Sequence, residues 1–123
     1  MSQVGKRFRL TEDEGRRLFC EHLPLRGSVT KKYKNIGLEN GWLLLKLDHP
    51  FDYQVENKTE KRFIGFSVSQ IAIRSRWAGH DIGGSQPTSV FVLIADSEEK
   101  FNTDIIDPKD FYFESWAMCH NEK

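Results

Sequence analysis

Apolar positions near the N-terminus follow the period of an α-helix. Thr11 followed by Glu14 fits a capping box, in which the hydroxyl and the carboxylate each accept a hydrogen bond from a backbone N–H at the helix start. Because proline cannot continue a helix, Pro24 marks the end. The residues that share the apolar face are Leu18, Phe19, His22 and Leu23. The pattern predicts an N-terminal helix over residues 12–22.

After Pro24 the pattern changes to the alternation of β-strands. Asn40-Gly41 lies between two apolar runs and predicts a tight hairpin turn of type I′, which needs positive φ at both central residues. The two strands of this hairpin would cover residues 29–38 and 42–48. The second strand is apolar on both sides, which is typical of a central strand.

A second hairpin is predicted from "FDYQVENKTEKRFIGFSVSQ", with "ENKTE" as its polar turn. Two structures remain open for residues 69–79, a short helix or a continued strand. The apolar face switches from even to odd positions between Val68 and Ile71, as it does where a strand passes through a β-bulge. The abundance of Ile, Phe and Val favours the strand.

Two further strands complete the predicted sheet. "TSVFVLIAD" predicts a buried strand over residues 88–95, and "FYFESWAMC" predicts the last strand. Between them, "SEEKFNTDIIDPKD" is polar, with a turn at Asp107-Pro108. One helix followed by hairpins predicts a single α+β domain over residues 1–123. In it the N-terminal helix packs on a mainly antiparallel sheet of five or six strands.

Composition agrees with an ordinary globular protein, with 29% charged and 38% hydrophobic residues. The formal net charge is zero, but the charges are unevenly distributed. Residues 1–34 carry nine Lys or Arg against four Asp or Glu, and residues 96–123 carry three against eight. The basic and acidic regions could neutralise each other in the fold or form two faces of opposite sign.

The cysteines and the apolar runs predict a cytoplasmic protein. Cys20 and Cys119 are too few for a disulfide framework, and we expect them to be reduced thiols. The start "MSQVGKRFRL" lacks the apolar run of a signal peptide. The longest apolar run, "VFVLIA", is too short to cross a bilayer, so we expect no membrane partner. The oligomeric state stays open.

The stretch "RSRWAGHDIGGSQP", residues 74–87, is the candidate binding site. Its arginines supply fixed positive charge, its tryptophan a stacking surface, and Gly83-Gly84-Ser85 backbone N–H groups that can hold an anion. Neither standard phosphate-binding loop is present, so a simple hairpin loop is the alternative. The candidate ligand-binding residues are Arg74, Arg76, Trp77, His80, Asp81 and Ser85.

A second candidate site consists of carboxylates on the second hairpin. Asp52, with Asp48 and Glu56 nearby, could bind Mg²⁺ at a strand end. The strings "PFDYQVE", "KRFIGFSVS", "SVFVLIAD" and "DFYFESW", after an amphipathic helix, resemble small PD-(D/E)XK, or restriction-endonuclease-like, domains. The resemblance implies that Asp52 is the first metal-binding acid. The positions of the family's second acid and lysine hold Gly65 and Ser67, which implies a degenerate, non-cleaving relative.

Two other sites are conceivable. Zinc could be bound by Cys20, His22, Cys119 and His120, but residues one or two apart point away from each other on helices and strands. Nucleic acid could bind the basic residues of "KRFR" and "TKKYK", with Tyr33 stacking on a base. The sequence pI of about 6.9 is low for a nucleic-acid-binding domain. The basic residues concerned are Lys6, Arg7, Arg9, Lys31, Lys32 and Lys34.

The sequence contains no complete catalytic set, so the leading hypothesis is a non-enzymatic binding module. It would recognise a protein partner or a small anionic ligand through the loop 74–87 and the adjoining sheet face, without a metal or cofactor. The alternatives are a metal-dependent, nuclease-like enzyme that uses Mg²⁺, or its degenerate relative, and a nucleic-acid-binding domain. The acidic tail could instead face a basic protein through Asp104, Asp107, Asp110 and Glu114.

Overall fold

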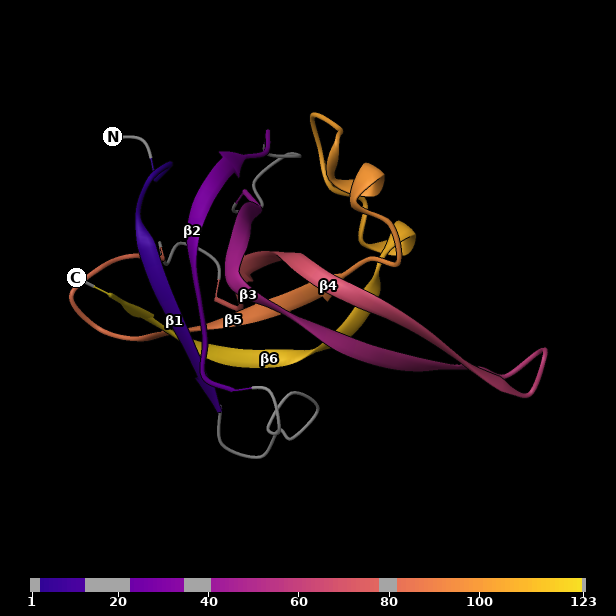
Figure 1. Ribbon diagram of the computed structural model, residues 1–123. Helices are drawn as coiled ribbons and strands as arrows, with labels where there is room; N and C mark the ends of the chain where they lie inside the picture. Colours follow the sequence, from indigo (N-terminus) through magenta and orange to yellow (C-terminus); the bar gives the residue numbers. More distant parts are fainter. Residues whose placement is uncertain (1–2, 13–22, 35–40, 78–81, 123) are drawn as a thin grey trace.

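Alternating inward and outward side chains form a closed antiparallel β-barrel of six strands (Figure 1). The computed structural model describes residues 3–12, 23–34, 41–77 and 82–122, with the backbone alone at 113–115. Each strand pairs with its neighbours in sequence, and the last strand pairs with the first. The strands are β1 (Arg7–Glu12), β2 (Leu25–Lys32), β3 (Leu43–Asn57), β4 (Arg62–Ser75), β5 (Thr88–Ile94) and β6 (Tyr112–Asn121).

One side of each strand fills the interior of the barrel. On β1, Phe8 and Leu10 are fully buried, whereas the alternate positions Arg7 and Arg9 lie on the outer face. Water is excluded from these apolar side chains, which is the main favourable contribution to folding. The buried residues of the interior are Phe8, Leu10, Leu25, Val29, Leu43, Leu45, Leu47, Val68, Ile71, Ile73, Ile82, Val90, Val92, Ile94, Ala117 and Cys119.

A second apolar cluster lies on the outer side of the barrel wall, under the connection between β5 and β6. This connection contains two short 3₁₀ turns, η1 (Glu98–Phe101) and η2 (Pro108–Asp110). The Tyr33 hydroxyl donates a hydrogen bond of 2.7 Å to the carbonyl oxygen of Phe101, and burial raises the pKa of Tyr33 to about 12. The buried members are Tyr33, Trp42, Leu44, Ala72, Leu93, Ala95, Phe101 and Ile106.

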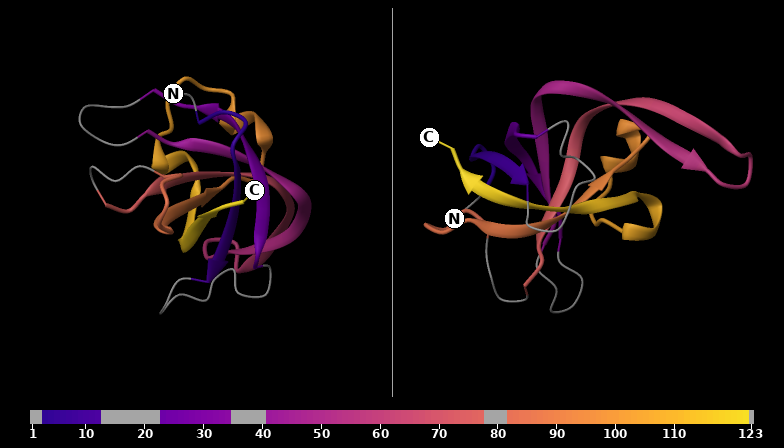
Figure 2. Two further views of the ribbon diagram at one scale, coloured as in Figure 1. Left: turned by 90° about the vertical axis from the view of Figure 1, so that its left-hand side faces the viewer. Right: turned by 90° about the horizontal axis from the view of Figure 1, so that it is seen from below.

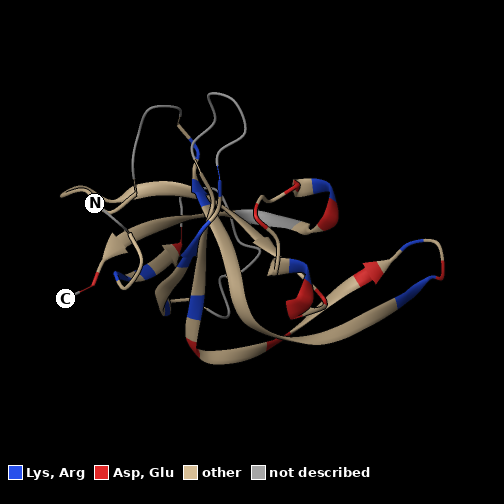
Figure 3. Cartoon of the chain, turned by 90° about the horizontal axis from the view of Figure 1, so that it is seen from above, with Lys and Arg blue, Asp and Glu red and all other residues tan. Residues whose placement is uncertain are grey.

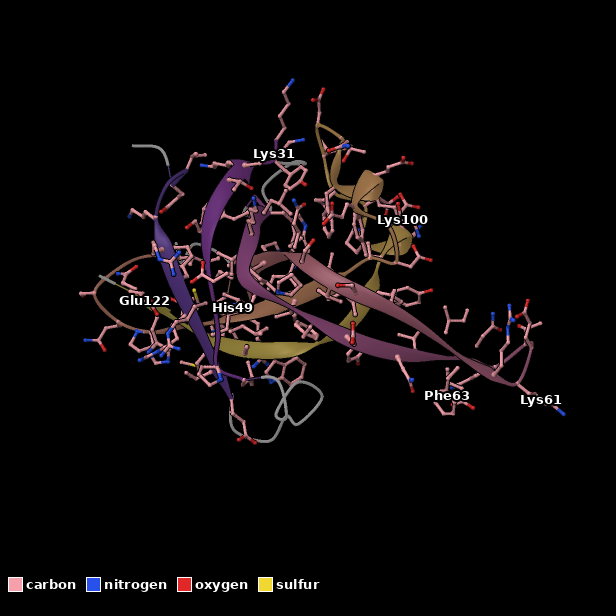
Figure 4. All side chains as sticks on the ribbon, in the orientation of Figure 1. Lys31, His49, Lys61, Phe63, Lys100 and Glu122 are labelled. Atoms are coloured by element: carbon pink, nitrogen blue, oxygen red, sulfur yellow. The ribbon has the colours of Figure 1, made fainter. Side chains whose placement is uncertain are left out.

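Strands β3 and β4 extend beyond the barrel as a two-stranded hairpin (Figures 1 and 2). β2 pairs with β3 only as far as Leu47, and β5 pairs with β4 only from Ala72 onward. The distal half has one apolar face, on which the Phe66 ring stacks against Tyr112 of β6 with centroids 5.8 Å apart. The hairpin tip is far from the barrel, and Phe63 near it is 68% exposed (Figure 4).

The prediction of an α+β fold with an N-terminal helix is wrong, because the described residues form an all-β barrel closed by β1 and β6. Glu12, the first residue of the predicted helix, ends β1 instead, and Thr11 pairs with Met118 of β6. The rest of the predicted helix lies outside the described residues. The capping-box signal was misleading because Phe8 and Leu10 continue an alternating strand pattern as far as Thr11.

Several strand predictions are confirmed. Residues 69–75 continue the strand β4, and the buried positions switch parity between Val68 and Ile71. β3 is a single strand instead of two, and its register against β4 shifts between Lys46 and Phe51. Pro50 lies in this interval, where its missing N–H costs no ladder hydrogen bond. The predicted turn at Asn40 lies outside the described residues.

The basic N-terminal part and the acidic C-terminal part of the chain contact each other. Glu122 accepts from Arg7 at 3.3 Å and from Arg26 at 2.8 Å. Lys31 donates to the carbonyl oxygen of Thr103 at 2.5 Å, in the acidic connection between β5 and β6 (Figure 3). These contacts favour the arrangement in which the two regions neutralise each other.

Candidate functional site

Outward side chains of β4, β5 and β6 form a row of arginines and aromatic rings. Arg74 of β4 is the cross-strand partner of Phe91 on β5, and Phe91 is the partner of Trp116 on β6. Cross-strand partners lie side by side on one face, so this register brings the three side chains together. We call the complete group the arginine–aromatic face, which consists of Trp42, Arg74, Arg76, Trp77, Phe91 and Trp116.

Each arginine of this face lies between two aromatic rings. The Arg74 guanidinium is 5.1 Å from the ring centroid of Trp42 and 5.3 Å from that of Phe91. The Arg76 guanidinium is 5.1 Å from Trp77 and 3.9 Å from Trp116. These distances are within the range of cation–π attraction, which fixes the arginine side chains. The arginines of the face are therefore already stacked between rings in the structure without a ligand.

Trp77 is the most exposed member of the face, with 56% of its surface accessible to solvent. It follows the end of β4, where its backbone N–H donates to the Ser75 hydroxyl at 3.2 Å. The Arg76 backbone N–H donates to the carbonyl oxygen of Ser89 at 3.0 Å. These bonds hold the start of the loop against the barrel and leave the Trp77 ring on the surface.

Hydrogen bonds from β6 hold the glycines of the loop against the barrel. The Asn121 side chain donates to the carbonyl oxygens of Gly83 at 3.0 Å and Gly84 at 2.6 Å. Gly83 has a φ of 97°, in the left-handed region that favours glycine. Ser85 is exposed, and His80 and Asp81 lie outside the described residues. The structure therefore unites Arg74, Arg76 and Trp77 from the six predicted ligand-binding residues.

The three carboxylates of the alternative site do not meet. Asp48 is engaged with Arg7, whose guanidinium hydrogen-bonds its carboxylate and lowers the pKa of Asp48. Asp52 and Glu56 lie on the outer side of the projecting hairpin, opposite Ser67 and Phe63 in register. Within the described residues, no group of three acidic, His or Cys side chains could hold a metal ion.

The other candidate sites are separated by the fold. Cys119 faces the barrel interior at 3% exposure, and burial raises the pKa of its thiol to about 12. The neighbouring His120 faces outward, where its Nε2 lies 2.8 Å from the Thr11 hydroxyl. Cys20 and His22 lie outside the described residues. Tyr33, suggested as a stacking surface for a base, is buried at 2% exposure.

Sequence reasoning missed half of the arginine–aromatic face. Trp42 lies directly before β3, Phe91 on β5 and Trp116 on β6, and only the fold brings them to the loop arginines. The available signal was the alternation itself, since Phe91 and Trp116 occupy outward positions on otherwise inward-packing strands. A large aromatic ring at an outward strand position indicates either a covering segment or a binding surface.

Comparison with known proteins adds no further identification. No family model matches the chain, and no curated protein or solved structure is significantly similar to it. The resemblance to PD-(D/E)XK domains therefore stays a prediction. The part of the chain that the structure describes contains no helix with the length and apolarity needed to cross a membrane.

Proposed function

We propose that the chain is a small non-enzymatic binding module that recognises a protein partner through its arginine–aromatic face. The observation that supports this most strongly is the Arg76 guanidinium between Trp77 and Trp116, with more than half of Trp77 exposed. Arginine and tryptophan carry a large share of the binding energy at protein interfaces. Because the stacked guanidinium groups are already fixed, binding costs little side-chain entropy.

The chemistry of this face favours an acidic and aromatic surface on the partner. Arg74 and Arg76 supply two positive charges, and complementary charge increases the rate and the specificity of association. The aromatic rings offer apolar area between the charges. A small anionic ligand is the other form of the same proposal. Cytoplasmic localisation is also part of it, supported by the buried thiol of Cys119.

The proposal predicts that Arg76→Ala with Trp77→Ala abolishes capture of the partner. The chain would be immobilised, exposed to extract of its source cells, and the captured proteins quantified by mass spectrometry. The barrel offers a matched control in Arg62→Ala with Phe63→Ala, a second adjacent Arg–aromatic pair at the hairpin tip. We expect at least one captured protein to fall about tenfold or more with the first variant and to stay unchanged with the second.

Three kinds of result would contradict the proposal. One is capture that is equal for both variants, or lost with the control pair instead. Another is a Mg²⁺-dependent nuclease activity that Asp52→Ala with Glu56→Ala abolishes, which would favour the enzymatic alternative. Salt-sensitive binding of DNA or RNA, lost on neutralising Lys31, Lys32 and Lys34, would favour the nucleic-acid alternative. Thermal unfolding of each variant confirms that the barrel is folded.

A further inference from the structure

A second group of basic side chains lies on the outer face of β2, β1 and β6. Arg9 of β1 is the cross-strand partner of Arg26 on β2 and of His120 on β6. The three positions therefore form a row across the sheet, with Arg9 in the middle. This row is separate from the arginine–aromatic face, and its chemistry is independent of the proposed recognition of a protein partner.

Carboxylates pair with the charges beside Arg9 but, within the described residues, not with Arg9 itself. Arg7 is paired with Asp48 and Glu122, and Arg26 is paired with Glu122 at 2.8 Å. Among the described residues, no carboxylate lies within 4.0 Å of the Arg9 guanidinium. The Arg9 Nε is buried and has no hydrogen-bond partner in the described part of the chain. A buried donor without a partner costs free energy.

Arg9 lies in the wall of a pocket of about 270 Å³. The lining residues are Arg9, Thr11, Glu12, Leu23, Pro24 and Arg26. Pro24 and Arg26 also line an adjoining pocket of about 370 Å³, which continues toward His49 and Phe51. Together the two pockets have the volume that small organic ligands occupy. Their walls combine apolar side chains with the guanidinium of Arg9.

The polar groups around Arg9 are His120, Thr11 and Glu12. Burial, and to a lesser extent the positive charge of Arg9, lower the pKa of His120. The Thr11 hydroxyl, 2.8 Å from the His120 Nε2, adds a polar group beside the guanidinium. Glu12 also lines the pocket, but it is exposed, so water screens its charge.

We propose that Arg9 binds the carboxylate or phosphate group of a small organic anion in this pocket. The Arg9 guanidinium, in the wall of the pocket, presents paired N–H donors that match either group. Arg26 also lines the pocket, but its charge is paired with Glu122, so Arg9 is the main anion-binding group. The apolar body of the ligand lies against Leu23 and Pro24, so an organic anion binds more tightly than inorganic phosphate.

NMR titration with phenyl phosphate and with benzoate tests this proposal on the intact chain. We expect at least one of them to shift the Arg9 Nε–H signal and the ring signals of His120, and the tighter one identifies the head group. Inorganic phosphate and neutral benzyl alcohol should both bind more weakly. In Arg9→Gln the dissociation constant should rise about tenfold or more, the cost of a lost charge-assisted pair. Arg9→Lys keeps the positive charge but not the paired N–H donors of the guanidinium, so its affinity should fall less than that of Arg9→Gln.

The matched control is Arg62→Gln, which removes one positive charge at the exposed hairpin tip. Its affinity for both probes should equal that of the unmodified chain. The proposal is overturned if neither probe binds at millimolar concentration, if Arg9→Gln binds as well as the unmodified chain, or if Arg62→Gln loses as much. Because each variant is checked by its thermal unfolding, a folding defect is distinguished from a lost contact.

Discussion

Phe8→Ala is expected to lower the free energy of unfolding by about 3–5 kcal/mol, the cost of removing a fully buried ring. Phe8 is 0% exposed at the inner side of β1 and belongs to the apolar cluster that fills the barrel. Alanine in its place loses the transfer free energy of the ring and leaves a cavity that neighbours on fixed strands cannot close. Since small domains have only about 5–15 kcal/mol of stability, this change brings the protein near unfolding.

Urea unfolding followed by tryptophan fluorescence measures this loss. Phe63→Ala is the matched control, because it truncates the same residue type at 68% exposure and should change the stability by less than about 0.5 kcal/mol. A loss below about 1 kcal/mol for Phe8→Ala would show that this side chain does not lie in a packed interior. In that case β1 would not be part of the barrel wall.

Gly27→Ala is the second large effect, with an expected loss of about 3 kcal/mol, at the upper end of ordinary overpacking. A Cβ at Gly27 would lie 2.2 Å from the backbone oxygen of Lys46 and 2.9 Å from its carbonyl carbon. These are backbone atoms of the neighbouring strand β3, so no side-chain rotation relieves the clash. The substitution therefore forces β2 away from β3, where Gly27 pairs with Leu47.

Gly65→Ala is the control for the effect of adding a methyl group to a strand glycine. A Cβ there would lie 3.7 Å from the Gln54 side chain, which is an ordinary contact. We expect no loss, or a slight gain, because alanine reduces the freedom of the unfolded chain. Equal stability of the two variants in thermal unfolding would contradict the close approach of β2 and β3 at Gly27.

The strands that the sequence predicted best are those whose pattern depends on local alternation. The predicted segment 88–95 corresponds to β5, and the predicted final segment corresponds to β6. The continuation of β4 past Val68 was also recognisable, because a bulge reverses the parity of the buried positions. Alternation is visible within a few residues, and it needs no knowledge of the neighbouring strand.

Closure of the barrel was not predictable in the same way. β1 pairs with β6 through contacts such as Leu10 with Cys119, which are separated by almost the whole chain. Nothing in a local pattern states which distant strand is the partner. The basic and acidic ends gave a partial signal, since Arg7 and Glu122 do meet across this pair.

The outer apolar cluster shows a second limit. The strand containing Leu44 was correctly described as apolar on both sides, which was interpreted as a central position in the sheet. The actual reason is that the connection between β5 and β6 covers the outer side of this strand. Phe101 and Ile106 of that connection, which the sequence showed only as a polar segment, pack in the same cluster as Leu44. Two buried side chains in a polar stretch are too few to give a periodic signal.

The candidate site also combines residues that a local pattern shows with residues that only the fold brings together. Arg74, Arg76 and Trp77 stood out because they are adjacent in the sequence and chemically unusual together. Phe91 and Trp116, which complete the stacking, depend on the register of β4, β5 and β6. One segment of the sequence can indicate a binding surface that spans several strands, but the other residues of that surface can be identified only from the fold.

Both proposed surfaces depend on β6 lying between β5 and β1, since β6 supplies Trp116 to one and His120 to the other. The most direct test of this arrangement is the set of backbone NOEs between β1 and β6 in the intact chain. We expect cross-strand NOEs at the pairs Leu10–Cys119 and Thr11–Met118, together with NOEs from β6 to β5. NOEs from β6 to β5 alone, with none to β1, would contradict the closed barrel and both surfaces that depend on it.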